Sequence, residues 1–176
     1  ALLTAERTAI NFVQLLSGVA TRTHQFVKAV KGTKARILDT RKTIPGLRIA
    51  QKYAVRVGGG MNHRIGLYDA ALVKDNHIEA TGSIGEAVKA VRRHAPFMAK
   101  VEVETSNLKQ VQEAIDAGAD VIMLDNMSLD QMRDPVKVVN KRAWIEASGG
   151  ITLETIRQVA ATGVDFISSG AITHSA

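Results

Sequence analysis

Short apolar runs recur along the chain, and a polar cluster follows most of them. The runs are rich in Val, Ile and Leu and lack the strict alternation of a strand with one face in water. Continuous apolar runs of this length are typical of parallel strands that are covered on both faces. The predicted strands are Ala35–Asp39, Ala71–Asp75, Ala99–Glu104, Asp120–Asp125, Ala143–Ser148 and Asp165–Gly170.

Between these runs, apolar residues recur at helical spacing in stretches that begin at Ile84, Leu108 and Ile156. Such stripes indicate helices that pack one face on a sheet. Ser83, with a glutamate three residues later, forms a capping-box pattern, and Thr152 is placed to cap the helix that carries Ile156. The sequence therefore predicts helices between the strands.

An amphipathic helix precedes the first predicted strand. Ala9, Phe12, Val13 and Leu16 form its apolar stripe, and we expect it to end near Gly18. We expect this helix to plug or flank the sheet.

A pattern repeats late in the chain, at residues 117–122 and 162–167. In each copy a glycine, Gly118 or Gly163, ends a helix in the left-handed conformation and leads into a strand. The repeated unit is one strand and one helix, as in a barrel of parallel strands, but too few units are present for a closed eightfold barrel. We predict an incomplete parallel α/β barrel of about six strands, with a preceding helix. Residues 1–176 would form this one domain, which we expect to be a piece of a longer protein.

Composition narrows the class of protein. The chain has 176 residues, of which 45% are hydrophobic, so it can bury one sizeable core. It has no cysteine and no membrane-length apolar run, which excludes disulfides and favours a reducing compartment, so we expect a cytoplasmic protein. The net charge of +6 would suit nucleic acid, but aromatic residues make up only 4% and no dense basic tract occurs. A small polyanionic ligand explains the charge as well.

Cationic residues follow the first two predicted strands, at the end of the sheet where parallel α/β folds bind ligands. Thr40, Arg41 and Lys42 follow the first strand, and we expect Pro45 to be the first residue of the next helix. Lys74 ends the second strand, where a buried charge is costly unless it is paired. A solvated Arg-Lys pair is the alternative, but the position after a buried strand favours an anion site.

Glycines 58–60 precede His63 and Arg64. The alternative is a flexible hairpin, but three glycines also allow positive φ angles and a close approach of the backbone to a ligand.

Acidic residues end the third and fourth predicted strands. Glu102 and Glu104 share one face by alternation, and Asp125 ends the next strand. These carboxylates could hold Mg²⁺ through water, accept hydrogen bonds from ribose hydroxyls, or stabilise a developing cation. Pairing with nearby Arg and Lys side chains is the structural alternative.

Small residues end the last two predicted strands. Ser148, Gly149 and Gly150 follow one, and Ser169 and Gly170 end the other. Two glycine-containing turns at the final strand ends of such a barrel indicate a phosphate site.

Three other residues are not predicted to take part in chemistry. We expect His24 and His94 to be surface residues of helices and Trp144 to lie in the core or in an interface. No histidine pair has the helical spacing of a zinc protease, which argues against a tightly bound transition metal.

Taken together, these motifs resemble the quinolinate phosphoribosyltransferase family, also called nicotinate-nucleotide pyrophosphorylase (carboxylating). The resemblance covers essentially the whole chain, in order, and involves many separated motifs. The segments that carry it are residues 6–11, 39–48, 58–64, 74–77, 101–104, 123–126, 148–150 and 170–175.

The resemblance implies that quinolinate and 5-phosphoribosyl 1-pyrophosphate react, with Mg²⁺, to give nicotinate mononucleotide, pyrophosphate and CO₂ in NAD biosynthesis. It further implies a homodimer or higher homo-oligomer in which Arg7 reaches the neighbouring subunit's site. The family's N-terminal α/β domain and its C-terminal segment have no counterpart in residues 1–176. Cavity closure is therefore expected to be incomplete in this chain alone.

The resemblance also implies roles for single residues. Arg41, Lys42, His63, Arg64 and Lys74 would surround the quinolinate carboxylates, with Lys42 and Lys74 also near the pyrophosphate. Glu104 and Asp125 would face the ribose and its metal, and Lys42, Lys74, Glu104 and Asp125 would be the catalytic residues. The substrate-binding set would be completed by Arg7, Thr40, Ser148, Gly149, Gly150, Ser169, Gly170 and His174. No general acid or base for decarboxylation is evident from the sequence.

Two alternative functions remain at this point. One is a related phosphoribosyltransferase-like barrel with a different aromatic acceptor, which would share the phosphate and ribose residues. The other is a non-enzymatic, anion-binding assembly subunit. A nucleic-acid site is disfavoured because the distinctive cations follow strand ends, inside a concave rim that a duplex could not reach.

Overall fold

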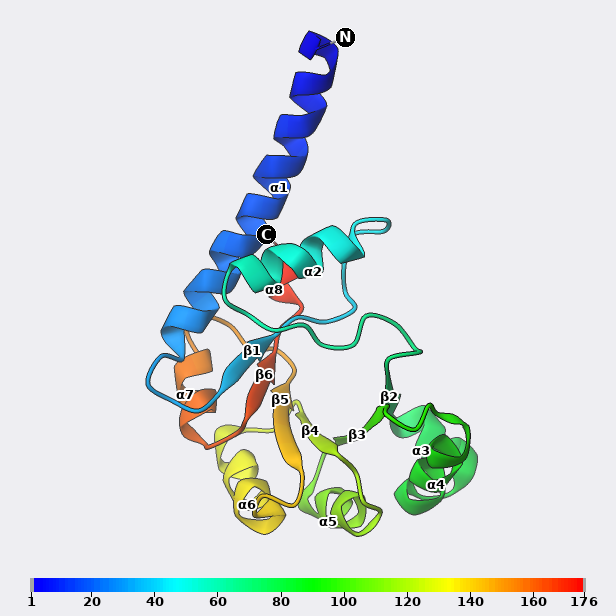
Figure 1. The fold of residues 1–176 in the computed structure, drawn as a ribbon. Helices are drawn as coiled ribbons and strands as arrows, with labels where there is room; N and C mark the ends of the chain where they lie inside the picture. The colour runs from blue at the N-terminus through cyan, green and yellow to red at the C-terminus, as the bar shows by residue number, and fades with distance from the viewer. Residues whose placement is uncertain (1, 176) are drawn as a thin grey trace.

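The computed structural model describes residues 2–175 and contains one parallel sheet of six strands in the order β1-β6-β5-β4-β3-β2 (Figure 1). Each predicted strand is present, and each begins within a residue or two of its predicted first residue. The sheet is not closed, since β1 and β2 are its two ends, so the prediction of an incomplete barrel is confirmed. The strands are β1 (Arg36–Leu38), β2 (Ala70–Val73), β3 (Lys100–Thr105), β4 (Val121–Asp125), β5 (Trp144–Ser148) and β6 (Phe166–Ser168).

Helices connect the strands, and α4 to α7 lie along the outside of the curved sheet (Figure 1). The helices are α1 (Leu2–Ala29), α2 (Arg48–Val57), α3 (Asp75–Thr81), α4 (Ile84–His94), α5 (Leu108–Asp116), α6 (Leu129–Val139), α7 (Ile156–Ala161) and α8 (Ala171–His174). Among residues 2–175, no helix combines the length and the apolar character that crossing a membrane would require.

Three predictions about helix starts differ in outcome. The Ser83 hydroxyl accepts a hydrogen bond from the Glu86 amide at 3.2 Å, so the predicted cap of α4 is confirmed. Thr152 does not cap α7, because residues 152–155 form a turn before the helix and Thr155 occupies the cap position. Pro45 does not begin α2 either: the next residue, Gly46, has a φ of 79°, which a right-handed helix cannot include.

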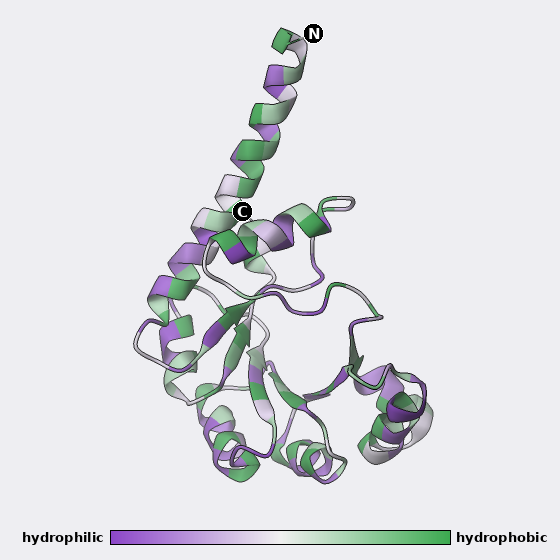
Figure 2. Cartoon of the chain, viewed as in Figure 1, coloured by the Kyte–Doolittle hydropathy of each residue, from purple (hydrophilic) through white to green (hydrophobic). Residues whose placement is uncertain are grey.

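The first helix is longer than predicted. Gly18 does not end it, because one glycine costs a helix only about 1 kcal/mol and the following turns bury Val19, Thr23 and Phe26. This second half of α1 packs against α2, α7, α8 and β1, so the helix flanks the sheet and does not plug it. The first half projects beyond the rest of the chain (Figure 1) and contains many apolar residues, green in Figure 2. Leu3 is among the exposed ones.

The late repeat has a structural role. Gly118 and Gly163 have φ angles of 73° and 95°, which confirms the predicted left-handed helix ends. The aspartate two residues after each glycine accepts a hydrogen bond from a strand alongside: Asp120 from the Val101 amide at 2.8 Å and Asp165 from the Ile145 amide at 3.0 Å. The repeat therefore fixes the starts of neighbouring strands.

Alternation along β3 separates the core from the barrel interior. Val101 and Val103 are fully buried beneath the outer helices, whereas Glu102 and Glu104 share the opposite face, as predicted. Trp144 is 52% exposed and contacts Phe166, so it is not a core residue of this chain, and its placement in an interface stays a prediction. His24 and His94 are exposed, as predicted.

Candidate active site

A cleft of about 650 Å³ lies at the carboxyl ends of the strands, and every predicted substrate-binding residue except Arg7 lines it. These residues are Thr40, Arg41, Lys42, His63, Arg64, Lys74, Glu104, Asp125, Ser148, Gly149, Gly150, Ser169, Gly170 and His174. They come from loops far apart in the sequence, which meet because parallel strands end at the same edge of the sheet.

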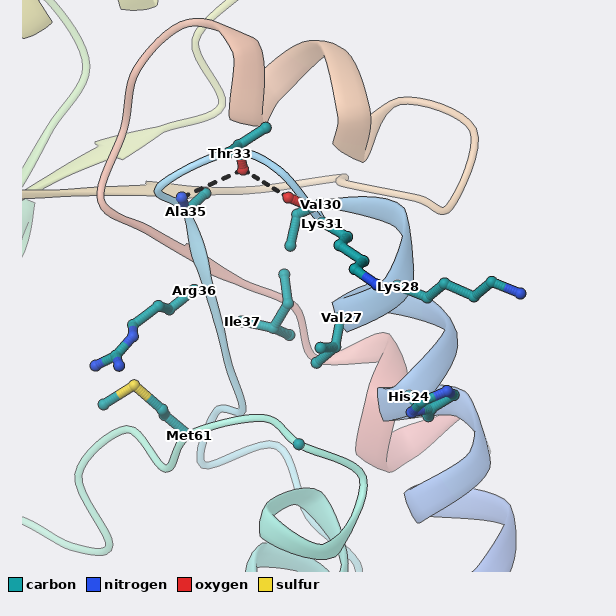
Figure 3. Close-up of a pocket in the computed structure, with 11 residues that line it drawn as sticks. His24, Val27, Lys28, Val30, Lys31, Thr33, Ala35, Arg36, Ile37 and Met61 are labelled. Atoms are coloured by element: carbon teal, nitrogen blue, oxygen red, sulfur yellow. Dashed lines mark hydrogen bonds between the residues drawn. The ribbon is translucent and has the colours of Figure 1, made fainter.

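A second hollow, of about 550 Å³, is lined by the end of α1, by β1 and by Met61 (Figure 3). Its lining combines cationic side chains such as Lys28 and Lys31 with apolar ones such as Val27 and Ile37. None of the predicted site residues lies there. The predicted chemistry is therefore concentrated in the cleft at the strand ends.

Two arginines, Arg41 and Arg64, line the cationic side of the cleft. Arg64 follows the glycine loop and donates a hydrogen bond to the Ala70 carbonyl at 3.2 Å. Burial, and then the neighbouring charge of Arg41, lowers the pKa of the Arg64 guanidinium. Two like charges this close repel each other, and a bound anion would relieve that repulsion.

An ion pair spans the adjacent part of the rim. Lys74 Nζ lies 2.9 Å from a carboxylate oxygen of Glu104, and both residues line the cleft. The alternative of structural pairing is thus realised at Glu104. Since the Lys74 side chain is 43% exposed, the pair is open to a ligand and is not locked in the core.

Asp125 lies at the end of β4, the strand next to the one that carries Glu104. Asn126 has a φ of 52°, and this turn lets its side-chain amide donate a hydrogen bond to the Asp125 carboxylate at 2.7 Å. The Asn126 backbone amide donates to the Ser148 carbonyl at 3.0 Å. The two loops that carry Asp125 and Ser148 are therefore held together.

Glycine is favoured at two turns of the cleft, where a phosphate site is predicted. Gly149 has a φ of 94°, and a Cβ atom there would overlap Asn126. A Cβ atom at Gly170 would lie 3.1 Å from Lys42 Cδ and 3.0 Å from the His174 ring, so Lys42 and His174 pack closely over this glycine. A backbone without side chains at these turns can approach a ligand closely.

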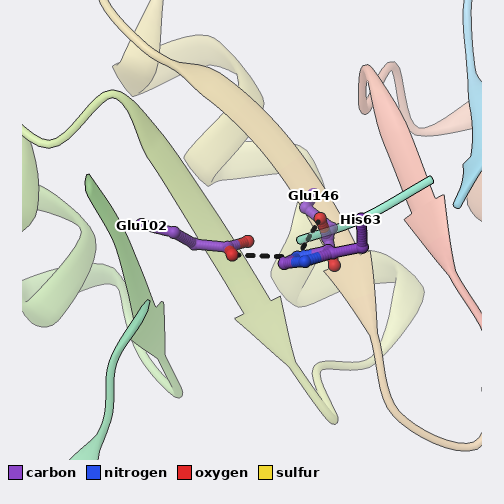
Figure 4. Close-up of side chains that lie close together, drawn as sticks. All are labelled: His63, Glu102 and Glu146. Carbon is purple, nitrogen blue, oxygen red and sulfur yellow. Dashed lines mark ion pairs between the residues drawn. The ribbon is translucent and has the colours of Figure 1, made fainter. Parts of the chain in front are cut away.

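Sequence reasoning missed one part of the site, a cluster on the floor of the cleft formed by His63, Glu102 and Glu146 (Figure 4). Nε2 of His63 lies 3.0 Å from Glu102 and 3.5 Å from Glu146. Both glutamates are almost fully buried, and the second oxygen of each has no hydrogen-bond partner among residues 2–175. The signal available in the sequence is a glutamate between two apolar residues of β5.

The cluster perturbs the acid–base behaviour of its members. Burial lowers the pKa of His63, but the hydrogen bonds and charges of Glu102 and Glu146 outweigh it and raise that pKa to about 10. Burial, and then the charge of Glu146, raises the pKa of Glu102 to about 7. The backbone amide of Arg64 donates to Nδ1 of His63 at 2.8 Å, which opposes a second ring proton.

The donor set of this cluster, one imidazole and two carboxylates, is of a kind that binds divalent metals. However, an imidazole that ligates a metal through Nε2 normally donates a hydrogen bond from its other nitrogen. Nδ1 of His63 instead faces an amide donor. The geometry thus places a proton on Nε2 between the carboxylates, and it favours a proton-holding cluster over a metal centre.

Comparison with known proteins identifies the family. The model of the family "Quinolinate phosphoribosyl transferase, C-terminal domain" matches residues 19–176. The chain belongs to this family. A probable nicotinate-nucleotide pyrophosphorylase (carboxylating) of Synechocystis is 55% identical over 99% of the chain and 60% of the relative, and the Mycobacterium leprae enzyme of that name is 51% identical over 99% and 62%. The nicotinate-nucleotide pyrophosphorylase structure from Francisella tularensis superposes with a TM-score of 0.95 at 52% identity, covering 98% of this chain and 61% of that one.

This member of the quinolinate phosphoribosyltransferase family thus spans 60 to 62% of the length of the relatives quoted. Arg7, the one predicted site residue outside the cleft, lies on the projecting half of α1 and is exposed (Figure 1). Because Arg7 does not line the cleft, its position does not support a role in this chain's own site.

Proposed function

We propose that the chain is the barrel part of an enzyme that transfers a phosphoribosyl group from 5-phosphoribosyl 1-pyrophosphate to quinolinate. Loss of CO₂ then gives nicotinate mononucleotide and pyrophosphate, in NAD biosynthesis. The observation that carries the proposal is the convergence of the predicted anion-binding residues on one cleft of a chain that belongs to this family.

The cationic side of the cleft suits the acceptor. Quinolinate carries two adjacent carboxylates, and Arg41, Arg64 and Lys74 supply several charged donors within one concave surface that His63 also lines. A monocarboxylate would leave part of this charge uncompensated. The composition of this side therefore favours a dicarboxylate over the alternative of another aromatic acceptor.

The glycine-containing turns of the cleft suit the phosphoribosyl donor, 5-phosphoribosyl 1-pyrophosphate. Ser148, Gly149 and Gly150 form one turn and Ser169 and Gly170 another, and such turns present backbone amides to a phosphate. His174 packs beside them, where it would contact the 5-phosphate. Lys42, which packs over Gly170, would then meet the pyrophosphate.

Glu104 and Asp125 would face the ribose. As C1 of the ribose loses pyrophosphate, the sugar gains positive charge, which nearby carboxylates stabilise electrostatically. Their hard oxygen atoms also fit Mg²⁺, which these two residues would hold directly or through water. When bound, the ion would neutralise charge on the departing pyrophosphate.

Decarboxylation needs no further cofactor. Once the ring nitrogen is ribosylated, the ring is cationic; the bond from C2 to its carboxylate breaks, CO₂ leaves, the electron pair stays on C2 beside the cationic nitrogen, and C2 then takes a proton from water. The chain would hold the carboxylates in place while this bond breaks.

We propose further that the enzyme is a cytoplasmic homodimer or larger homo-oligomer. The exposed position of Arg7 on a projecting helix supports its reaching the site of a neighbouring subunit. The cysteine-free sequence suits a reducing compartment.

Calorimetric titration tests the acceptor assignment. Quinolinate should bind the chain, nicotinate should bind at least about tenfold more weakly because one carboxylate is missing, and Arg64→Ala should abolish the difference. Arg133→Ala, at an exposed position on α6, is the matched control and should bind like the wild type. Equal affinity for the two ligands in the wild type would contradict the dicarboxylate assignment.

A further inference from the structure

Helix α2 buries two polar side chains and exposes three large apolar ones, unlike an ordinary surface helix. Its polar residues Gln51 and Lys52 are 0% and 3% exposed, whereas its apolar residues Ile49, Tyr53 and Val57 are each more than 60% exposed. Burying polar side chains costs free energy unless each finds a partner. The inward face of α2 therefore combines apolar packing through Ala54 and Val55 with specific polar contacts of Gln51 and Lys52.

Gln51 connects two segments of the cleft. Its side-chain oxygen accepts a hydrogen bond from the Ile44 amide at 2.8 Å, and its side-chain nitrogen donates to the Thr173 carbonyl at 2.9 Å. Thr173 closes the link, because its hydroxyl donates to the Lys42 carbonyl at 2.7 Å. The loop that carries Lys42 and the short helix that carries His174 are thereby fixed to each other.

Lys52 acts on a different segment. Its ammonium group pairs with the buried Asp39 at 2.5 Å and also donates to the His63 carbonyl at 2.8 Å. Asp39 accepts from the His63 amide at 2.8 Å, and its other oxygen accepts from Asn62 at 2.7 Å. The buried ion pair of Lys52 and Asp39 therefore hydrogen-bonds to the peptide groups on both sides of His63, the residue before Arg64.

We propose that Gln51 and Lys52 are positioning residues with separate tasks. Gln51 sets the spacing between Lys42 and the turn at Gly170, which together would hold the two phosphate-bearing ends of the donor. Lys52, through Asp39, sets the position of His63 and Arg64, which would hold the acceptor. This inference rests on the proposed function, since it assigns the two sides of the cleft to the two substrates.

The proposal makes a prediction that a purely structural role does not. Gln51→Met keeps the length of the side chain but removes both hydrogen bonds, so KM for 5-phosphoribosyl 1-pyrophosphate should rise about tenfold, the equivalent of about one lost hydrogen bond, while KM for quinolinate changes less than about twofold. Lys52→Met should raise KM for quinolinate about tenfold and change KM for 5-phosphoribosyl 1-pyrophosphate less than about twofold. A general loss of stability would raise neither KM selectively.

The test is a steady-state assay of the full chain with each substrate varied in turn. Gln158→Met and Lys109→Met, at exposed positions on α7 and α5, are the matched controls and should leave both KM values unchanged. Because Lys52→Met leaves Asp39 buried without its partner, the double variant Asp39→Asn/Lys52→Met is measured beside it. The double variant removes both charges and should give the same selective rise in KM for quinolinate. Thr173→Val should behave like Gln51→Met.

The outcomes separate the two proposals. Opposite selectivity of the Gln51 and Lys52 variants supports separate positioning tasks. An active wild type whose variants change both KM values in parallel, or change neither, would overturn the positioning proposal alone. A wild-type enzyme that does not convert this substrate pair would refute the proposed function itself, and the assignment of tasks with it.

Discussion

The cluster of His63, Glu102 and Glu146 predicts an unusual dependence of stability on pH. His63 has a pKa raised from 6.5 to about 10, so its interactions stabilise the fold fully below pH 6.5 and are lost as pH rises through about 10. Glu102 has a pKa raised from 4.5 to about 7. Its contribution to the stability of the fold is therefore fully present below pH 4.5 and is lost as pH rises through about 7. Both effects make the folded chain less stable as pH increases.

The magnitude follows from proton counting. Between about pH 7.5 and 9, folded His63 retains roughly one proton that the unfolded chain has released, so the free energy of unfolding should fall by about 1.4 kcal/mol per pH unit. Replacing both glutamates, Glu102→Gln/Glu146→Gln, removes the charges that hold this proton. The double variant should lack that slope, since burial then lowers the pKa of His63.

Urea unfolding at pH 7.5, 8.25 and 9 measures the effect as the difference between wild type and double variant, which cancels titrations common to both. Glu86→Gln/Glu113→Gln changes the net charge equally at exposed positions and should keep the wild-type slope. Parallel lines for wild type and the buried double variant would refute the reasoning. They would show that the Arg64 amide at Nδ1 keeps the His63 ring neutral despite the two carboxylates.

Three further predictions concern single positions. Gly149→Ala should destabilise the chain by roughly 2 kcal/mol or more and weaken binding of 5-phosphoribosyl 1-pyrophosphate in a calorimeter, whereas Gly82→Ala, with a similar φ of 88° but open space around it, should cost only about 1 kcal/mol. Asp125→Asn should raise the Mg²⁺ concentration for half-maximal turnover about tenfold or more, and an unchanged Mg²⁺ dependence would remove Asp125 from the metal site. Mixing inactive Arg7→Ala and Lys42→Met subunits should restore turnover if Arg7 acts in the neighbouring site, and a mixture as inactive as its components would exclude that arrangement.

The sequence predicted the strands well for a physical reason. A strand covered on both faces needs a continuous apolar run, and a short run such as residues 121–124 leaves few other possibilities. Predictions from one turn residue were less successful. Gly18 lies inside α1 because tertiary packing of Phe26 and its neighbours outweighs a weak local preference.

The rim of the cleft was also predictable, because residues after parallel strands must gather at one edge of the sheet. The layer beneath the rim was not. Whether Glu146 or Lys52 is buried depends on partners from distant segments, His63 and Asp39, and periodicity alone does not tell which face of a helix such as α2 points inward.

The measurement that tests the central claim most directly is release of labelled CO₂ from quinolinate labelled at the C2 carboxylate. The account predicts release only when 5-phosphoribosyl 1-pyrophosphate and Mg²⁺ are both present, in equal amounts with nicotinate mononucleotide, and none in the Lys42→Met variant. Release without the phosphoribosyl donor, or nucleotide formed with the label retained, would contradict it.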